Sequence, residues 1–214
     1  MNRRHLLLII SYFFVFLITI NCGSKPEDSE YVPLKAGSYK YIQETTHGEE
    51  KSSIKVAIDI LEPREVEGLK VIPRELKEIG FEFVLTEFLI KKEDGIVQVG
   101  TQIKDIDGIH PPSIYKKEGK QDEYILKYPI RAGKKWEHKT ECASTTYEYE
   151  NIDEEIQIEN HTYKNCLRLK AITHFCEGEN EDIVTRWFAP GIGMVKFIAD
   201  NEKESSHIEL YLIR

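Results

Sequence analysis

Apolar and polar residues alternate along several segments of the chain. The inward positions of this alternation are Ile54, Val56, Ile58 and Ile60; Val97, Val99, Thr101 and Ile103; Leu167, Leu169, Ala171, Thr173 and Phe175; and Ile208, Leu210 and Leu212. A period of two residues is typical of a strand with one buried and one solvated face. Such strands build antiparallel sheets that cover a core on one side. The pattern therefore predicts an all-β protein made of antiparallel sheet.

Turn-forming sequences separate these segments. They are EDG at 93–95, DG at 107–108, HPP at 110–112, EGK at 118–120 and PG at 190–191. Together with the alternating segments they predict about ten strands. The only helix candidate, residues 73–79, is too short and too charged to matter. We therefore expect no helix longer than two turns in residues 31–214.

The second half of the chain echoes the first at a constant offset of 96 residues. The matched segments are PLKAG at 33–37 with PIRAG at 129–133, DGIVQV at 94–99 with PGIGMV at 190–195, and, more weakly, EGLKV at 67–71 with YKNCL at 163–167. A fixed internal period indicates repeated structural units. We expect two similar β-lobes, residues 31–125 and 126–214. The alternative is one curved, half-barrel-like sheet in which similar turns recur.

The first 30 residues have the order of an export signal followed by a tether. A short basic start leads into an apolar run from Leu6 to Ile20, which at fifteen residues is shorter than the roughly 18–20 that span a bilayer. Cys22 then marks an abrupt change to small and polar residues. This order resembles a bacterial lipoprotein signal, in which the cysteine is acylated and becomes the mature N-terminus. We expect a signal peptide over 1–21, lipid attachment at Cys22 and a flexible tether over 22–30.

The residues before Cys22 fit the lipoprotein pattern loosely. Thr19 and Asn21 stand where leucine and a small residue are usual, which resembles the relaxed signals of spirochaetal lipoproteins. The alternatives are an ordinary secretory signal or an uncleaved anchor, with Cys22 incidental. The departure bears on how efficiently the signal would be processed.

The charge of the chain limits its partners. The formal net charge is −8, and removal of residues 1–21 takes away two arginines and no acidic residue, which leaves −10. Nucleic-acid binding needs a basic face, so we expect no nucleic-acid partner. Adhesion to an anionic leaflet by charge is disfavoured in the same way, which leaves the lipid as the membrane anchor. The acidic run 177–182 is best interpreted as a solvated loop, because it lacks the spaced ligands of a calcium loop.

Three cysteines remain after Cys22, namely Cys142, Cys166 and Cys176. An oxidising compartment favours a disulfide and leaves one thiol over. Cys166 and Cys176 lie along one expected strand, about 30 Å apart when extended. If residues 145–158 fold back on 164–175, Cys142 approaches Cys176, and this pair is our disulfide candidate. The alternatives are three buried free thiols, or a zinc site made by His174 with Cys142 and Cys176.

Two segments resemble a group of uncharacterised exported bacterial lipoproteins. Residues 128–136 (YPIRAGKKW) look like the opening of that family, and residues 186–196 (RWFAPGIGMVK) are similar to its C-terminal signature W-[YF]-A-P-G-[VI]-G-x-V-K. Residues 160–166 match a third element weakly. The resemblance implies an exported β-sheet or half-barrel domain and brings no catalytic residues.

The WFAPGIG run also has a physical interpretation of its own. Pro190 and Gly191 suit a tight turn that needs a fixed φ followed by a positive one. Gly193 would let a neighbouring segment approach the returning strand closely. The run could form a binding loop with an aromatic floor, or a hairpin corner capped by aromatic side chains.

The sequence contains no recognisable catalytic motif. There is no nucleophile elbow and no phosphate-binding loop, and the histidines lack metal-ligand spacing. We therefore expect no enzymatic activity, no metal and no cofactor. Two functions remain. The first is a membrane-anchored envelope lipoprotein that binds an envelope or host protein or plays a structural role. The second is a carrier or chaperone for lipids or lipoproteins, with an apolar concave sheet. We expect the protein in the cell envelope, periplasmic or surface-exposed, on the outer rather than the inner membrane.

Overall fold

The computed structural model describes residues 26–115, 122–176, 181–201 and 206–213. In these residues it contains one short 3-10 helix and fifteen strands. They are η1 (Asp28–Tyr31), β1 (Gly37–His47), β2 (Glu50–Ile60), β3 (Arg64–Val66), β4 (Leu69–Glu78), β5 (Val84–Lys92), β6 (Gly95–Asp105), β7 (Gly108–Ile109), β8 (Ser113–Ile114), β9 (Glu123–Lys127), β10 (Lys135–Lys139), β11 (Ala143–Ile158), β12 (His161–Phe175), β13 (Glu181–Ala189), β14 (Gly193–Asn201) and β15 (Ser206–Ile213). The all-β fold expected from the alternation is confirmed.

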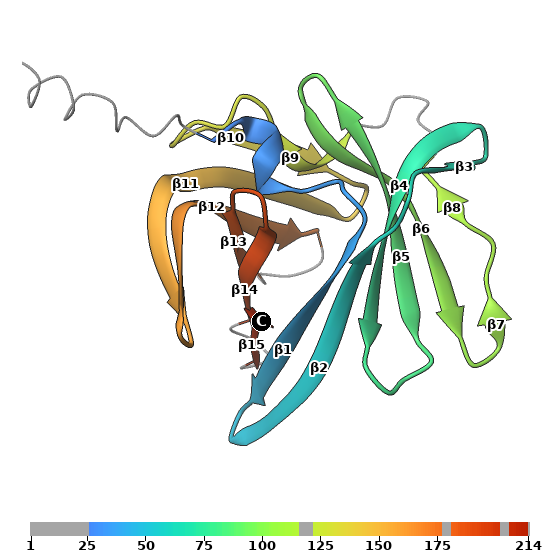
Figure 1. Ribbon diagram of the computed structural model, residues 1–214, viewed down its shortest axis with the longest axis horizontal. Helices are drawn as coiled ribbons and strands as arrows, with labels where there is room; N and C mark the ends of the chain where they lie inside the picture. The colour runs from blue at the N-terminus through green and yellow to red at the C-terminus, as the bar shows by residue number, and fades with distance from the viewer. Residues whose placement is uncertain (1–25, 116–121, 177–180, 202–205, 214) are drawn as a thin grey trace, which may run out of the picture.

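All the strands belong to one antiparallel sheet. Its order is β10-β11-β12-β13-β14-β15-β1-β2-β4-β5-β6-β7, while β3 pairs with β4, and β8 and β9 pair with β6. The first and last strands of the described chain meet in the middle, where Tyr41 of β1 faces Leu212 of β15. Figure 1 shows β1 and β2 at the centre, with β10–β14 on one side and β4–β8 on the other.

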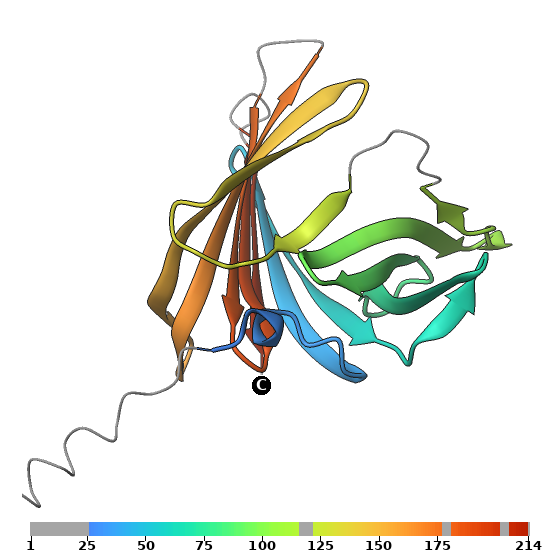
Figure 2. The same ribbon diagram turned by 90° about the horizontal axis from the view of Figure 1, so that it is seen from above.

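The sheet is curled so that its two sides face each other. Five strand steps separate β13 from β4, a distance of about 24 Å on a flat sheet. Arg186 of β13 nevertheless interacts electrostatically with Arg74 of β4 and Glu87 of β5. Seen from above, the strands from β4 to β8 form a second layer that stands at an angle to the first (Figure 2). The sheet therefore has a concave side, which we call the inner face.

Apolar side chains fill the end of the inner face near η1, which lies at the top of Figure 1. We call this cluster the closed core; its buried members are Tyr31, Val32, Val71, Phe88, Leu89, Ile96, Val97, Val99, Tyr124, Leu126, Trp136, Tyr149, Leu167, Leu169 and Phe188. They come from both sides of the curl, so the core holds the two layers together. Tyr31 and Val32 of the N-terminal segment are 3% and 5% exposed and cover this end of the core.

The N-terminal segment is folded from η1 onward. The Asp28 carboxylate accepts a hydrogen bond from the Ile130 amide at 3.0 Å, and the Gly191 amide donates to the Glu30 carbonyl at 2.9 Å. The Tyr31 hydroxyl donates to the Asn165 carbonyl at 3.1 Å. Residues 28–30, which we expected to be part of the flexible tether, therefore belong to the folded body.

The order of the strands repeats along the chain. The succession β1-β2-β4-β5-β6 returns as β10-β11-β12-β13-β14, with the same neighbours in the sheet. The pairing register does not follow the offset of 96, because Phe88 faces Gly100 whereas Val184 faces Ala199. The boundary that we expected at 125–126 falls inside β9, and the division into two lobes stays a prediction.

The one helix candidate of the sequence is a strand. Residues 73–79 lie in β4 and the turn after it, and Pro73 pairs with Phe88 of β5. Phe88 is fully buried, and Pro73 is among the least exposed side chains of the molecule. Burial against β5 thus decides the conformation of a segment whose local sequence does not alternate clearly.

Candidate functional site

Of the residues singled out from the sequence, Cys22 lies outside the described part of the chain, together with residues 1–21. Its acylation stays a prediction. None of the described residues forms a helix long and apolar enough to cross a membrane.

The disulfide candidates lie opposite each other at one end of the β11–β12 pair. Ala143 faces Phe175, and the Cys176 amide donates to the Cys142 carbonyl at 2.9 Å. Hydrogen-bonded partners on antiparallel strands have Cα atoms about 5.5 Å apart, which is within the range of disulfides. Both cysteines are exposed free thiols here. The bond stays a prediction, and non-reducing peptide mapping of the exported protein checks it.

Cys166 lies far from this pair in a different environment. It is fully buried in β12, and burial raises the pKa of its thiol to about 12, with a smaller contribution from Glu154. A thiol with so high a pKa is almost entirely protonated near neutral pH and is a poor nucleophile. Cys166 is therefore a packing residue.

The histidine of the alternative zinc site has another partner. His174 Nδ1 lies 3.1 Å from a carboxylate oxygen of Glu181 on the adjacent strand β13. Among the described residues, no three histidine, cysteine or acidic side chains are placed to hold a metal ion. Part of the acidic run, residues 177–180, lies outside the described chain.

The WFAPGIG run forms the turn between β13 and β14. Gly191 and Gly193 have φ values of 70° and 99°, in the region that favours glycine. A Cβ atom on Gly193 would lie 2.9 Å from Cδ of Pro33, so this glycine also allows the N-terminal segment to pass close by. The Trp187 ring is half-buried, with Lys196 Nζ 5.6 Å from its centroid. The turn thus anchors the segment that follows η1.

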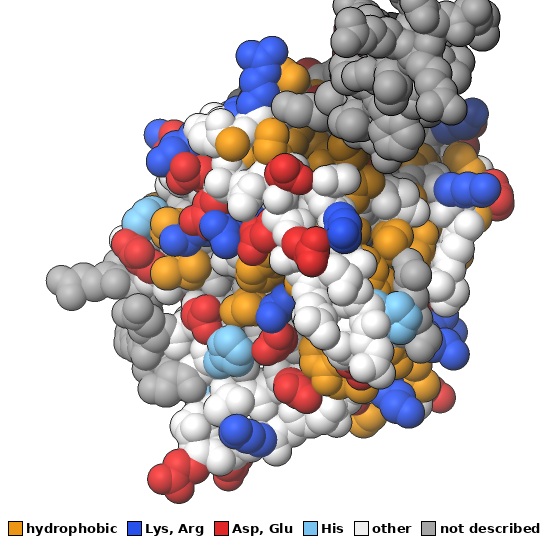
Figure 3. All heavy atoms as spheres, turned by 60° about the vertical axis from the view of Figure 1, so that its left-hand side comes forward, with side chains coloured by type: hydrophobic (Ala, Val, Ile, Leu, Met, Phe, Trp, Pro, Cys, Tyr) orange, Lys and Arg blue, Asp and Glu red, His pale blue; other side chains and the backbone are white. Residues whose placement is uncertain are grey.

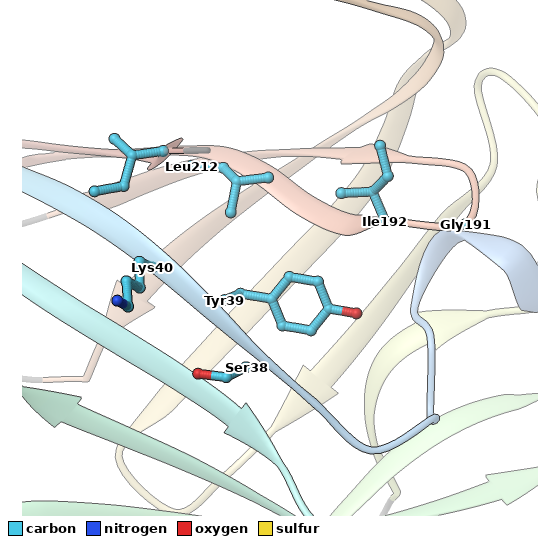
Figure 4. A pocket seen from close by; sticks show the side chains of 7 residues that line it. Ser38, Tyr39, Lys40, Gly191, Ile192 and Leu212 are labelled. Atoms are coloured by element: carbon cyan, nitrogen blue, oxygen red, sulfur yellow. The ribbon is translucent and has the colours of Figure 1, made fainter.

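A cavity of about 460 Å³ opens beside this turn. Its lining comes from the start of β1, the end of β15 and the turn, namely Ser38, Tyr39, Lys40, Gly191, Ile192, Leu212 and Ile213. Figure 4 shows the ring of Tyr39 extending toward the turn at Gly191 and Ile192. Lys40 is the only charged residue of this lining. The cavity therefore offers contact surface and no acid–base pair.

The outer face of β11 and β12 carries charged side chains of both signs. Arg168 Nε lies 2.9 Å from Glu150, and Lys164 lies 3.5 Å from Glu155. Figure 3 shows acidic and basic side chains intermingled on this side of the molecule, with apolar groups between them. The Lys164–Glu155 pair is exposed, and exposed ion pairs contribute about 0–1 kcal/mol each. This surface is solvated, and the face shown in Figure 3 has no large cluster of side chains of one charge.

The inner face differs below the closed core. Strand pairing places Leu76 opposite Leu85 and Leu85 opposite Ile103, and on the other side Val184 opposite Ala199. Most of these apolar side chains are half-buried, and Ile103 is 39% exposed. We call this region the open inner face; it comprises Ile54, Leu76, Leu85, Ile103, Val184, Phe197 and Ile208. Leu76 and Phe197 pack against a second buried cluster that includes Tyr41, Ile58, Leu210 and Leu212. The other side chains of this apolar region are only partly covered.

Charged side chains lie between the closed core and the open inner face. Arg74 and Glu87 form an ion pair at 2.6 Å, with side chains 20% and 14% exposed. Arg186 stands between Leu169 and Phe197 in the strand register, and its guanidinium carbon lies 5.7 Å from the Phe197 ring centroid. Burial lowers the pKa of Arg186, and Arg74 lowers it further, while Tyr147, Glu87 and Glu123 oppose this.

The sequence alone did not point to these charges. Arg186 was noted only within the family signature, yet it alternates with Val184 and Phe188 on one face of β13. A charged residue on the apolar side of an alternating strand was the sequence signal that could have identified Arg186. The approach of Arg74 and Glu87 to Arg186 could not be found in this way, because it results from the curl of the whole sheet.

No protein-family model matches this chain, and no curated protein matches its sequence. Two solved structures are similar in outline. One is a Bacteroides fragilis protein described as exported and as having a YmcC-like fold, with 8% identity, a TM-score of 0.39 and coverage of 86% of this chain and 97% of the other. The other is a Parabacteroides distasonis protein described as a lipoprotein, with 8% identity, a TM-score of 0.40 and coverage of 85% and 96%. Likenesses this distant assign no family.

Proposed function

We propose that this protein is a non-enzymatic lipoprotein of the bacterial cell envelope, whose curled sheet carries the apolar part of a ligand. The observation that carries the proposal is the open inner face. Globular proteins rarely leave a contiguous apolar concave surface partly uncovered unless something binds there. Leu85 and Val184 are only half-buried on this face, whereas the members of the closed core on the same strands are buried.

The proposed attachment to a membrane rests on the sequence order around Cys22. Only five residues separate Cys22 from η1, which spans at most about 18–20 Å when extended. The folded body would therefore stay close to the membrane that holds the lipid. We expect Cys22→Ser to remove the protein from the detergent phase of a membrane extract. A variant that still partitions there after signal cleavage would contradict the anchor.

The non-enzymatic part of the proposal is supported by the surroundings of the histidines. His110, His174 and His207 each lie within 3.1 Å of a carboxylate, and their side chains are 49%, 54% and 44% exposed. In the described residues no serine or cysteine is hydrogen-bonded to any of them. These pairs lack the third member that nucleophilic catalysis needs.

The test of the carrier function is a measurement of what the mature protein retains. We expect solvent extraction of the purified, acylated protein, followed by mass spectrometry, to yield an amphiphilic molecule at close to one per chain. Leu85→Asp is the matched variant, because it puts a charge on the open inner face without touching the closed core. Recovery of the same amount of amphiphile per chain from the wild-type protein and from Leu85→Asp would contradict the proposal.

A second candidate function is the binding of an envelope protein through two neighbouring turns. The β4–β5 turn exposes Phe81 and Phe83, and the region between β6 and β7 exposes Ile106, which are 66%, 51% and 84% accessible. Both turns lie at the lower end of Figure 1, opposite η1. A photo-crosslinking residue at Phe81 should then give a discrete adduct in intact cells, and the same residue at exposed Glu65 should not.

A further inference from the structure

Arg186 is a half-buried cation without a contact counter-ion in the part of the chain that the structure describes. The ring of Phe197 lies beside its guanidinium group, but no hydrogen bond or ion pair to Arg186 occurs among the described residues. Its neighbours in the strand register, Leu169 and Phe197, are apolar. A guanidinium has five donors in a fixed fork, and removing it from water without partners is costly. The loss of water is the main reason why the pKa of Arg186 is lowered.

The charges that face Arg186 leave one positive charge unmatched in contact. Arg74 is neutralised by Glu87 at 2.6 Å, with both side chains held in adjacent strands. Glu123 of β9 and Tyr147 of β11 act on Arg186 only through space. A ligand with a single negative charge would supply the direct contact that Arg186 lacks.

The surface next to Arg186 is apolar and leads to the lower edge of the sheet. Phe197 and Val184 lie beside Arg186 on the same side of the curl, and Leu76, Leu85 and Ile103 lie on the facing side. Beyond them the β4–β5 turn carries exposed Phe81 and Phe83. The other end of the inner face is filled by the closed core, so a long apolar group can extend only toward this edge.

We propose that Arg186 binds the head group of a long-chain amphiphile with one negative charge, while the chain lies on the open inner face toward the β4–β5 turn. A carboxylate is the simplest such head group, because it matches the guanidinium fork with two parallel hydrogen bonds. This inference rests on the proposed carrier function and names its ligand class and its anchoring residue.

The test compares two probes that differ only in charge. Oleate and oleyl alcohol, which have the same chain, are offered at equal concentration to the mature acylated protein, and occupancy is measured by native mass spectrometry. We expect the wild-type protein to bind oleate at least tenfold more tightly than oleyl alcohol. Arg186→Met should remove this preference and leave the binding of oleyl alcohol unchanged. Arg186→Lys, which keeps the charge but not the fork, should retain part of it.

Arg168→Met is the matched control, because Arg168 is also a half-buried strand arginine but pairs with Glu150 on the outer face. It should keep the full preference for oleate. If Arg186→Met weakens both probes equally, or if the preference survives it, the assignment of Arg186 is wrong while the carrier function stands. A wild-type protein that binds both probes equally would overturn only the head-group inference. Binding of neither probe would overturn the inference and the carrier function together.

Discussion

The closed core and the open inner face are built on the same strands and yet differ in packing. On β5, Leu89 is fully buried in the closed core, whereas Leu85, four residues earlier on the same face, is half-buried. Leu89 faces Gln98 and belongs to the same buried cluster as Tyr31 and Val32, while Leu85 faces partly exposed Ile103. The difference lies in what covers each leucine from across the curl. A sheet face that is continuous in its hydrogen bonding is therefore divided into a structural part and a part that is available to a ligand.

Arg186 and its facing charges mark the border between these two parts. Above it, Leu169 and Phe188 pack against residues of β5, β6 and β9. Below it, Val184 and Ile208 are only half-buried. An ion pair and a guanidinium that has no contact counter-ion among the described residues keep apolar packing from extending further down, because their desolvation would be unfavourable. Polar groups at the border thus preserve a surface that further apolar packing would have closed.

The largest expected effect comes from substituting the two leucines of β5. Leu89→Ala should lower the free energy of unfolding by about 2–5 kcal/mol, because it leaves a cavity in a packed core. Leu85→Ala should cost about 1 kcal/mol or less, because its side chain is already partly in contact with water. Urea unfolding of the two variants measures the difference. Equal costs would mean that the open inner face is in fact packed like the core.

Much of this fold, but less of its site, could be predicted from the sequence. The alternation at 54–60, 97–103, 167–175 and 208–212 identified strands correctly. The expected common face of 97–103 is wrong, because a register shift opposite Phe88 and Leu89 puts Val97 on the other face from Thr101 and Ile103. Residues 73–79 gave no clear alternation, and their place in β4 depends on packing against Phe88. The difference between Leu85 and Leu89 is not contained in local periodicity at all. This difference in burial depends on the curl, which places residues of β9, β11 and β12 in the same buried cluster as Leu89.

A smaller effect should separate the two glycines of the turn that supports the upper end of the closed core. Gly193→Ala should cost about 2–3 kcal/mol, because it combines a positive φ with a contact of 2.9 Å to Pro33. Gly191→Ala should cost about 1 kcal/mol, because its φ is positive but no atom lies near the added methyl group. Gly191→Val is expected at 1–3 kcal/mol, since branching adds to the strain.

Thermal unfolding measures the stability of these variants, and limited proteolysis during heating reports on the segment after η1. If Gly193→Ala displaces Pro33, the protease should cleave near residues 31–34 before the sheet unfolds. Gly191→Ala should not show this early cleavage. Identical proteolysis of both variants would mean that the closed core does not depend on the N-terminal segment that covers it.

The smallest expected effect lies on the outer face, where Asp59 accepts hydrogen bonds from Lys77 and Ser38. Burial alone would raise the pKa of Asp59, but these two donors outweigh it and hold the pKa below its usual value. A group whose pKa is lowered by folding stabilises the protein above its unfolded pKa, near 3.9, and this contribution is lost as the pH falls through the folded value. Asp59→Asn should therefore cost about 1 kcal/mol at pH 7.

The cost of Asp59→Asn should shrink as the pH falls below about 4, because the wild-type carboxylate is then also neutralised. Ser38→Ala is the matched control, since it removes one donor and keeps the charge, and it should show a smaller cost with the same pH dependence. Urea unfolding of both variants between pH 7 and pH 3 measures this. Neither variant should alter the binding of oleate, because Asp59 points away from the inner face on which Ile58 and Ile60 lie. A loss of ligand binding in Asp59→Asn would show that the two faces of the sheet are coupled, and the separation of structure from binding would then fail.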